Sequence, residues 1–405
     1  MDKTPIASRL HVGIFGNTNA GKSSLFNAIF GQEIAIVSTE KGTTTDPIIK
    51  AMELSAFGPI ALVDTGGLDD QGKIGLRRVE KTKKMLERID LALYATDIND
   101  FQELEYLDTV LQFEKNKVPH ILVFTKVDKA VQPRKEQIKK SYKKAVFTAK
   151  DDQHSINVLK QTIGQGLQEL KVENESVIGD LLAPGSTVIM VVPLDSGAPK
   201  GRLILPQVQF IRECLDFRVN CFVTKETELE EALANLKKVD LVVTDSQVFG
   251  FVDNIVPKEI PITSFSMLLA KQKGDIDILI EGVKQIKNLP AGGKILMAEG
   301  CSHGHTHEDI GRVKIPAFIE KYTGKKLKFD FYSGYDFPDN LKDYDLVVHC
   351  GGCMLNKKVI YTRLWICEAA GVPVTNYGIV LAYLNGIFPR CYEIFYPKEV
   401  GLTDD

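Results

Sequence analysis

The segment with the clearest chemistry is residues 16–23, GNTNAGKS, which fits the pattern G-x-x-x-x-G-K-[ST]. In this pattern glycines let backbone N–H groups point at a phosphate, the lysine reaches the β- and γ-phosphate oxygens, and the serine hydroxyl binds Mg²⁺. An apolar run, Leu10–Phe15, comes before the segment, and Ser24–Phe30 has helical periodicity after it. This strand–loop–helix order predicts a nucleotide-phosphate site. The residues expected to line the site are Asn17, Asn19, Ala20, Gly21, Lys22, Ser23 and Ser24.

A second phosphate motif follows the apolar run Ile60–Val63, where Asp64 and Gly67 form Asp-x-x-Gly. We expect Asp64 to hold the Mg²⁺ shell through water and the Gly67 N–H to contact the γ-phosphate. Between the two motifs lies GTTTD at residues 42–46, in which Thr44 is the candidate for a second hydroxyl on Mg²⁺. A Thr-rich surface loop is the alternative, but the position of the segment favours a nucleotide-sensing loop. Lys22, Thr44 and Gly67 are therefore the expected catalytic residues.

Two later segments indicate that the base is guanine. The apolar run His120–Phe124 leads into TKVD at residues 125–128, and VFTAK ends another strand at residue 150. Asp128 can accept hydrogen bonds from the guanine N1–H and the exocyclic amine, a donor pair that adenine lacks. A backbone N–H after the second strand could meet the guanine O6, so we expect GTP and GDP to bind with Mg²⁺. The base site is assigned to Thr125, Lys126, Asp128, Thr148, Ala149 and Lys150.

The order of these motifs resembles the translation-factor-related GTPases, and in particular the tRNA-modification GTPases of the TrmE type. That group carries Asn-Ala-Gly-Lys-Ser, Gly-Thr-Thr-x-Asp and Asp-Thr-x-Gly, as this chain does. Thr125 replaces the usual Asn, which predicts looser support of the phosphate loop, and Leu68 stands where Ras-like proteins place a catalytic Gln. The resemblance implies a bound K⁺ held partly by Asn19, and hence slow hydrolysis that K⁺ accelerates. An ordinary turn residue is the alternative for Asn19.

Composition limits the classes of protein that the chain can belong to. Its 405 residues, 44% of them apolar, suit two or three domains with ordinary cores. The net charge of −3 argues against a broad nucleic-acid surface. The apolar runs are far below the ~18–20 residues that span a bilayer, and the N-terminus has no apolar leader, so we expect a cytoplasmic protein without a membrane role. The chain has seven cysteines, which is an odd number, and it is expected to be cytoplasmic. We therefore do not expect a disulfide framework.

Strand and helix patterns alternate in three blocks. They predict an α/β chain: a P-loop GTPase domain over residues 1–172, followed by two smaller α/β domains with mainly parallel sheets over residues 173–272 and 273–405. The middle block shows no catalytic motif, and we assign it to homodimer formation. The strands expected after the GTPase domain cover residues 188–192, 219–223, 240–244, 294–298, 326–332, 344–348 and 372–375, and the helices cover 207–215, 226–238 and 357–370.

Cysteine and histidine cluster after two strands of the last block. One strand leads to Cys301 and His303, and another leads to His349, Cys350 and Cys353. Because parallel sheets place their ligands at the carboxyl ends of strands, these segments can meet. A thioredoxin-like pair is disfavoured, since it leaves Cys301 unexplained. A structural zinc site and an iron–sulfur cluster fit the spacing equally well.

The whole combination resembles the HydF family of [FeFe]-hydrogenase maturation GTPases. The resemblance implies a [4Fe–4S] cluster on Cys301, Cys350 and Cys353. It also implies a scaffold that carries the diiron subcluster of the H-cluster to apo-[FeFe]-hydrogenase, with that hydrogenase and two radical-SAM maturases as partners. The fourth cluster ligand stays open among His303, His349, Glu299, water and an exogenous group.

Two other functions remain open from the residues. One is a TrmE/Era-like GTPase directed to RNA or the ribosome, with a structural zinc site, and the other is a zinc metallochaperone GTPase. Side chains near the cysteines are assigned ordinary roles. We expect solvated charges at Lys357, Lys358 and Arg363, with attraction of an anionic precursor as the alternative, and core packing at Cys214, Cys221 and Cys367.

Overall fold

The computed structural model describes residues 5–31, 48–55, 57–65, 84–171, 176–193, 203–300 and 310–396. The chain divides into two compact units, residues 1–174 and residues 175–405. Each unit is considered by itself below. Among the described residues, no helix combines the length and the apolar character needed to cross a bilayer.

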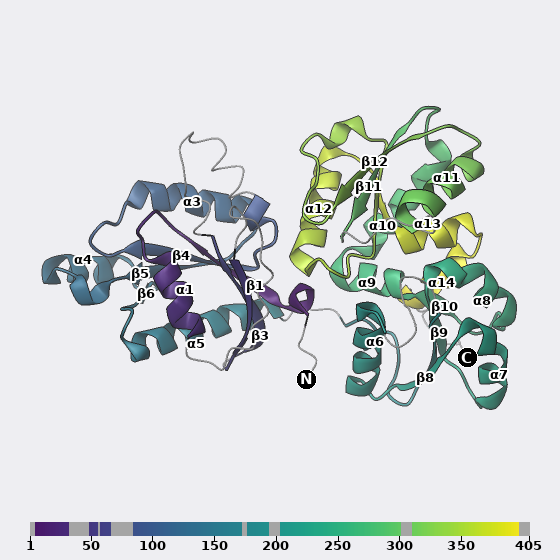
Figure 1. Cartoon of the computed structure of the whole chain (residues 1–405), viewed down its shortest axis with the longest axis horizontal. Helices are drawn as coiled ribbons and strands as arrows, with labels where there is room; N and C mark the ends of the chain where they lie inside the picture. The colour runs from purple at the N-terminus through teal and green to yellow at the C-terminus, as the bar shows by residue number, and fades with distance from the viewer. Residues whose placement is uncertain are drawn as a thin grey trace, which may run out of the picture. The chain divides into compact units, whose positions relative to one another are not determined.

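The first unit is built on a six-stranded sheet in the order β2-β3-β1-β4-β5-β6, in which only β2 runs antiparallel to its neighbour (Figure 1). Successive side chains of a strand point to opposite faces. Val12 and Ile14 therefore pack with α1 and α5, while Phe15 packs on the other face with Phe113 of α3. The strands are β1 Leu10–Phe15, β2 Ile48–Leu54, β3 Gly58–Asp64, β4 Leu91–Asp97, β5 His120–Thr125 and β6 Val146–Phe147. The helices are α1 Lys22–Phe30, α3 Glu103–Lys115, α4 Gln132–Ser141 and α5 Gln153–Lys171.

The second unit contains two four-stranded sheets, and every strand pair in them is parallel. The first has the order β10-β9-β7-β8 and the second the order β12-β11-β13-β14. The first sheet comprises β7 Thr187–Val191, β8 Asn220–Thr224, β9 Leu241–Thr244 and β10 Ile262–Ser264, with helices α6 Leu205–Asp216, α7 Leu229–Asn235, α8 Phe249–Ile255 and α9 Phe265–Lys273. The second comprises β11 Lys294–Glu299, β12 Lys328–Ser333, β13 Leu346–His349 and β14 Val374–Asn376, with helices α10 Ile276–Val283, α11 Ile315–Thr323, α12 Lys357–Ala370, α13 Tyr377–Leu384 and α14 Phe388–Tyr392.

These elements confirm the predicted fold class, a P-loop domain followed by α/β units with parallel sheets. β1 and α12 have the predicted bounds. The predicted helix over residues 226–238 is shorter: a 3₁₀ turn covers Glu226–Glu228, and α7 follows it. β10 and α9 were not predicted, because β10 has three residues and passes into α9 at Ser264, whose hydroxyl accepts a hydrogen bond from the Met267 N–H. α10, which follows the capping residue Asp275, was not predicted either.

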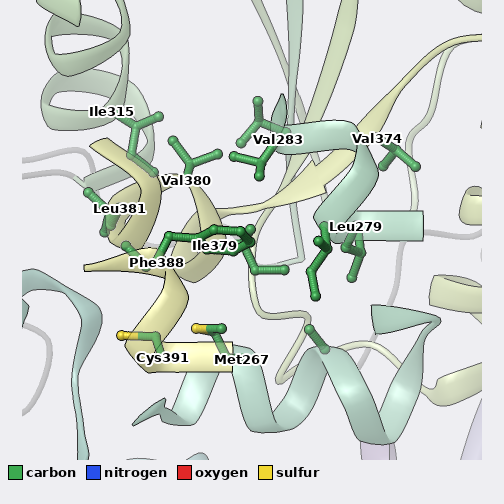
Figure 2. Packing of buried hydrophobic residues seen from close by; sticks show 14 of the residues in the cluster. Met267, Leu279, Val283, Ile315, Val374, Ile379, Val380, Leu381, Phe388 and Cys391 are labelled. Carbon is green, nitrogen blue, oxygen red and sulfur yellow. The ribbon is translucent and has the colours of Figure 1, made fainter. Parts of the chain in front are cut away.

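One apolar core joins the two sheets of the second unit. Its members include Ile189 and Val242 from the first sheet and Ile295 and Val347 from the second, all fully buried. Figure 2 shows part of this core, where side chains of α10, α11, α13 and α14 meet around Ile379. Because the two sheets share these contacts, residues 175–405 pack as one body.

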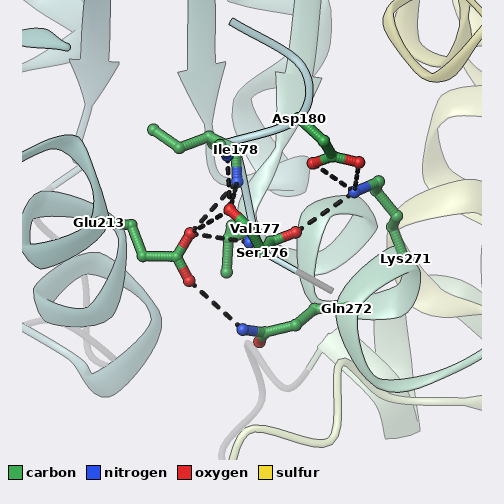
Figure 3. A network of polar contacts seen from close by, with 8 residues as sticks. Ser176, Val177, Ile178, Asp180, Glu213, Lys271 and Gln272 are labelled. Atoms are coloured by element: carbon green, nitrogen blue, oxygen red, sulfur yellow. Dashed lines mark hydrogen bonds and ion pairs between the residues drawn. The ribbon is translucent and has the colours of Figure 1, made fainter. Parts of the chain in front are cut away.

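Helix α9 lies between the two sheets. Met267 belongs to the shared core, whereas Leu268 packs on the other face of the first sheet with Phe210 of α6. Polar contacts fix the end of the helix (Figure 3): Lys271 forms an ion pair with Asp180, with Nζ 2.6 Å from Oδ2. The Gln272 amide donates to Glu213 Oε1 at 3.4 Å, and Glu213 Oε2 in turn accepts from the N–H of Val177 at 2.8 Å. The position of α9 is therefore set by packing on both faces and by a polar network.

Candidate nucleotide and cysteine sites

The phosphate loop connects the end of β1 to the start of α1. Gly16 has φ 135° and Gly21 has φ 89°, values that favour glycine. A Cβ at Gly16 would lie 1.9 Å from the Ala95 carbonyl oxygen, so no larger residue fits there. The backbone N–H groups at the start of α1 are the ones that an anion can use. Ser23 and Ser24 are exposed at this end of the helix.

Lys22 is buried and its ammonium donates to the carbonyl oxygens of Gly16 at 2.7 Å and Asn17 at 2.8 Å. The side chain therefore curls over the loop instead of extending into solvent. The Asn17 side-chain amide donates to Glu105 of α3. The loop is thus fixed from inside by Lys22 and from outside by α3.

Asp64 ends β3, the strand next to β1, and is paired in register with Ile14. Its carboxylate is buried at the carboxyl edge of the sheet, beside the start of the phosphate loop. The neighbouring Thr65 hydroxyl donates to the Ile14 carbonyl. Thr44, Gly67 and Leu68 lie outside the described residues.

The two segments assigned to the base contact each other. The Val127 N–H donates to the Thr148 carbonyl at 3.2 Å, and the Thr148 N–H donates to the Phe124 carbonyl at 2.8 Å. Lys126 forms an ion pair with Asp97, with 2.9 Å between Nζ and Oδ2. These bonds hold the TKVD and TAK loops together at one end of β5 and β6.

The side chains available to a base differ in exposure. Asp128 and Lys150 are exposed, and Thr148 is buried. The Ala149 N–H, expected at the guanine O6, donates to the Ser155 hydroxyl at 3.2 Å. The Lys126 ammonium also donates to the Asn19 carbonyl at 2.8 Å, so the base loop and the phosphate loop are directly linked.

Thr125 retains part of the support that an Asn would give. Its hydroxyl lies 2.6 Å from the carbonyl oxygen of Ala20, in the phosphate loop, and 3.1 Å from that of Thr96. A hydroxyl has a single hydrogen to donate, whereas an Asn amide has two. Thr125 therefore holds the loop through one donated bond at a time.

The strands before the two cysteine segments are neighbours. β11 pairs in parallel with β13, with Ala298 opposite His349, so the predicted meeting of their carboxyl ends is confirmed for the strands. Cys301 and His303 lie outside the described residues, but Gly300, which precedes Cys301 in the sequence, donates its N–H to Cys350 Sγ at 2.9 Å. Within the described ranges, no group of three or more His, Cys, Asp or Glu side chains gathers as a metal site.

Cys350 lies in a setting suited to a metal-bound thiolate. Its sulfur accepts N–H groups from Gly300 and, at 3.3 Å, from Gly352. Burial raises the pKa of the Cys350 thiol above its ordinary value, while the two N–H groups act in the opposite direction. Burial likewise raises the pKa of Cys353, and the Lys273 charge opposes it. Zinc and iron–sulfur sites bind cysteine as the thiolate, which N–H groups of this kind stabilise, and metal binding removes the thiol protons.

His349 is buried and both of its ring nitrogens are engaged. Nδ1 lies 2.8 Å from the Cys350 carbonyl oxygen, and Nε2 lies 2.9 Å from Nη1 of Arg363. A carbonyl only accepts and a guanidinium only donates, so Nδ1 carries the proton and the Nε2 lone pair faces Arg363. Burial lowers the pKa of His349 to about 3, and the Arg363 charge adds to this effect. In this arrangement Nε2 is occupied by Arg363, not directed to a metal.

Glu299, another candidate fourth ligand, also has partners. Its Oε2 accepts from Arg312 at 2.8 Å and from the Ser333 hydroxyl at 3.1 Å. Before Glu299 could act as the fourth cluster ligand, its ion pair with Arg312 would have to break, and both side chains of this pair are mostly buried. Glu299 or His349 would therefore have to give up existing hydrogen bonds before either could bind a cluster.

Two buried cations near the cysteines were missed by sequence reasoning. Arg363 was expected to be solvated, and this was wrong: it is 4% exposed and also donates to the Gly334 carbonyl at 2.7 Å. Lys273 ends α9, and its ammonium donates to carbonyl oxygens in the loop that holds Cys350 and Cys353. No local pattern marks Lys273, because a lysine in the last turn of a helix is ordinary. By contrast, Cys214 and Cys367 are fully buried in apolar cores, as expected.

Three family models match the chain. A model of the 50S ribosome-binding GTPase matches residues 11–126, the hydrogen maturase F dimerization domain matches residues 177–274, and the hydrogen maturase F tetramerization domain matches residues 277–394. The chain therefore contains a GTPase domain, which binds GTP or GDP with Mg²⁺, and two domains of the kind that assemble oligomers.

Similar proteins match the GTPase part. GTPase Der of Sulfurimonas denitrificans is 38% identical over 136 residues, 33% of this chain and 27% of that protein. The tRNA modification GTPase MnmE of Legionella pneumophila is 32% identical over 172 residues, 42% of this chain and 35% of that protein. The G domain of the T. maritima FeoB iron transporter is 25% identical, covering 40% of this chain and 95% of that domain, with a TM-score of 0.27.

The chain spans about a quarter to a third of the length of these two curated relatives, so they describe its first part alone. The rest is described by the two hydrogen maturase F models, which together match more than half of the chain. With a GTPase domain in front of both, the chain belongs to the hydrogen maturase F (HydF) family.

Proposed function

We propose that the chain is a GTP-hydrolysing scaffold of [FeFe]-hydrogenase maturation. In this proposal it carries a [4Fe–4S] cluster on Cys301, Cys350 and Cys353, and it assembles the diiron subcluster of the H-cluster and transfers it to apo-hydrogenase. The observation that carries the proposal is the parallel pairing of β11 with β13, which sets Gly300 against the Cys350 sulfur in a chain that also has a complete phosphate loop.

The nucleotide roles are assigned to the residues at the carboxyl edge of the first sheet. Lys22 would exchange its loop carbonyls for the β- and γ-phosphate oxygens, and Ser23 and Thr44 would bind Mg²⁺. Asp64 would order the metal's water, and the Gly67 N–H would contact the γ-phosphate. Binding of the phosphates and the base is assigned to Asn17, Asn19, Ala20, Gly21, Ser24, Thr125, Lys126, Asp128, Thr148, Ala149 and Lys150.

The residues present fit an iron–sulfur cluster. A [4Fe–4S] cluster bound by three thiolates leaves one iron without a cysteine, and that iron is where the diiron precursor could attach through a bridging group. The backbone N–H groups on Cys350 and the nearby Lys273 charge offset the negative charge of such a group. Because His349 and Glu299 have other partners, we propose that His303, water or an exogenous group fills the fourth position.

The proposal also includes the domain boundaries, the oligomeric state and the partner proteins. We propose domain boundaries at 1–172, 173–272 and 273–405, which the ranges of the family models support, and a homodimer through the middle domain. β8 is an edge strand of its described sheet and exposes Phe222 and Val223, apolar groups that a second copy could cover. The proposed partners are apo-[FeFe]-hydrogenase and the two radical-SAM maturases, in the cytoplasm.

The test of this function is the metal content of anaerobically purified or reconstituted protein. We expect about four irons and four sulfides per chain, with an EPR signal after reduction. Stoichiometric zinc without sulfide, even after anaerobic reconstitution with iron and sulfide, would exclude the cluster and leave a GTPase with a zinc site.

Potassium should accelerate GTP hydrolysis. Asn19 has φ 62° and its side chain is exposed in the phosphate loop, where it could help to hold a cation beside the phosphates. We expect a faster rate in KCl than in NaCl at equal ionic strength, and we expect Asn19→Ala to remove most of the difference. Equal wild-type rates in the two salts would refute the role of K⁺.

A second candidate is an RNA- or ribosome-directed GTPase with a structural zinc site. The match of residues 11–126 to the 50S ribosome-binding GTPase model and the similarity to a tRNA modification GTPase favour it. The net charge of −3 counts against it, since RNA-binding surfaces are usually basic. Salt-sensitive binding of RNA together with zinc in place of iron would support this alternative.

A further inference from the structure

Lys273, the last residue of α9, is a buried lysine of the second unit. It is 6% exposed, although lysine is almost never buried without a partner. Its ammonium donates to the carbonyl oxygens of Leu355 at 2.9 Å, Gly352 at 3.0 Å and Cys353 at 3.5 Å. A lysine ammonium has three N–H donors, and all three are directed to this one loop.

The loop that Lys273 holds is the one that carries the two cysteines. Gly352 has φ 62°, and a Cβ there would lie 2.6 Å from Ile360, so the loop is tightly packed against α12. A Cβ at Gly351 would lie 3.3 Å from the Ser266 hydroxyl of α9. Both ends of α9 therefore contact the cysteine loop, through Ser266 at the start and Lys273 at the end.

The charge of Lys273 is offset by backbone carbonyl groups. Taking an ammonium out of water is costly unless an anion or a full set of hydrogen bonds replaces the water, and the three carbonyl oxygens supply such a set. In the described part of the chain no carboxylate forms an ion pair with Lys273, while its charge does interact with Cys353 and Cys350. The positive charge of Lys273 therefore lies against the cysteine loop, where it would stabilise an anionic group bound by Cys350 and Cys353.

α9 also connects this loop to the rest of the unit. Lys271 and Gln272, the two residues before Lys273, are fixed to Asp180 and Glu213 (Figure 3). α9 is the last helix of the region matched by the dimerization model, and the cysteine loop lies in the region matched by the tetramerization model. Lys271 and Gln272 thus bind α9 to its own region, and Lys273 binds it to the cysteine loop of the other.

We propose that Lys273 is a positioning residue for the cluster: it fixes the carbonyl groups of the cysteine loop and supplies the positive charge that stabilises the anionic group bound there. This inference rests on the proposed function for its charge effect. A cation beside a cluster favours the reduced state, because reduction adds negative charge. Loss of the charge should therefore make the reduction potential more negative, and loss of the hydrogen bonds should loosen the loop even in the apoprotein.

The experiment compares wild type with Lys273→Met, Lys273→Gln and Lys273→Arg. Lys284→Met is the matched control, because it removes an exposed lysine of the same unit, which pairs with Glu281. The first measurement is hydrogen exchange of the amides of residues 350–356 in full-length apoprotein. We expect about tenfold faster exchange in Lys273→Met and near wild-type exchange in Lys284→Met.

The second measurement is the midpoint potential of the reconstituted cluster by EPR-monitored titration. We expect Lys273→Met and Lys273→Gln to be more negative than wild type and Lys273→Arg to be close to it. Unchanged exchange and potential in Lys273→Met would overturn the proposal. If Lys273→Met does not fold, Lys273→Gln decides, since it removes the charge but keeps two N–H donors on a side chain one bond shorter. A wild type that binds no iron refutes the proposed function instead, and the exchange measurement still tests the positioning role.

Discussion

Replacement of Lys22 by Met should lower kcat/KM for GTP hydrolysis by about 10²–10³-fold, the effect expected when one preorganised donor is removed from developing charge. The Lys22 ammonium is the buried cation of the phosphate loop, and it is held within that loop by the carbonyls of Gly16 and Asn17. Methionine has a similar length but cannot offer a charge to the β- and γ-phosphates. Steady-state phosphate release with saturating Mg²⁺ measures the change.

The control for this experiment is Lys115→Met, which removes an exposed lysine at the end of α3. We expect this variant to hydrolyse GTP within about twofold of wild type, as surface substitutions rarely disturb a distant site. Circular dichroism and the thermal unfolding midpoint would establish that the Lys22 variant is folded. A folded Lys22→Met that retains more than a third of wild-type kcat/KM would contradict the assignment of Lys22.

Replacement of Cys350 by Ser should remove the iron–sulfur cluster. Iron and sulfide should fall from about four per chain to well below one, because a serine hydroxyl has a far higher pKa than a thiol and is a poor ligand for this cluster. Ser would also lose most of the N–H···S interactions that Gly300 and Gly352 make with the sulfur. Iron and sulfide analysis after anaerobic reconstitution measures the loss.

Cys221→Ser is the matched control, since Cys221 is also partly exposed but lies on β8, in the other sheet. We expect it to keep the full cluster. Hydrolysis of GTP should persist in both cysteine variants, because the phosphate loop lies in the first unit. A Cys350→Ser protein that still holds four irons would show that the cluster has other ligands.

The sequence predicted those parts of the fold whose pattern is local. β1 is a mostly apolar run that ends before Gly16, and α12 lies between Asn356, whose side chain caps its first turn, and Gly371, so their bounds agree with the structure. β10 could not be recognised, because three residues are too few to show a period. α9 follows it closely, and the burial of both faces of α9 removes the amphipathic pattern that marks a surface helix.

The candidate sites, like the fold, were predicted where the pattern is local in the sequence and missed where it is not. The phosphate loop and the Cys-x-x-Cys segment were predicted because their chemistry resides in neighbouring residues. Lys273 was not, because the carbonyls it binds lie 79 to 82 residues further along the chain. Arg363 was assigned to solvent, since it is buried only through contacts with His349 and with the carbonyl groups of Gly334 and Asp336, which are distant in sequence. Contacts of this kind arise from tertiary structure and leave no spacing to detect.

The apolar core that joins the two sheets has a consequence for how the chain can be divided. Residues 177–274 and 277–394 match separate family models, yet Met267 of the first region packs in the same cluster as Ile379 and Phe388 of the second. A protein truncated at residue 274 would expose this cluster to water, and the remaining piece would do the same. The two regions should therefore melt in a single cooperative transition, and neither should be a stable fragment when it is expressed alone.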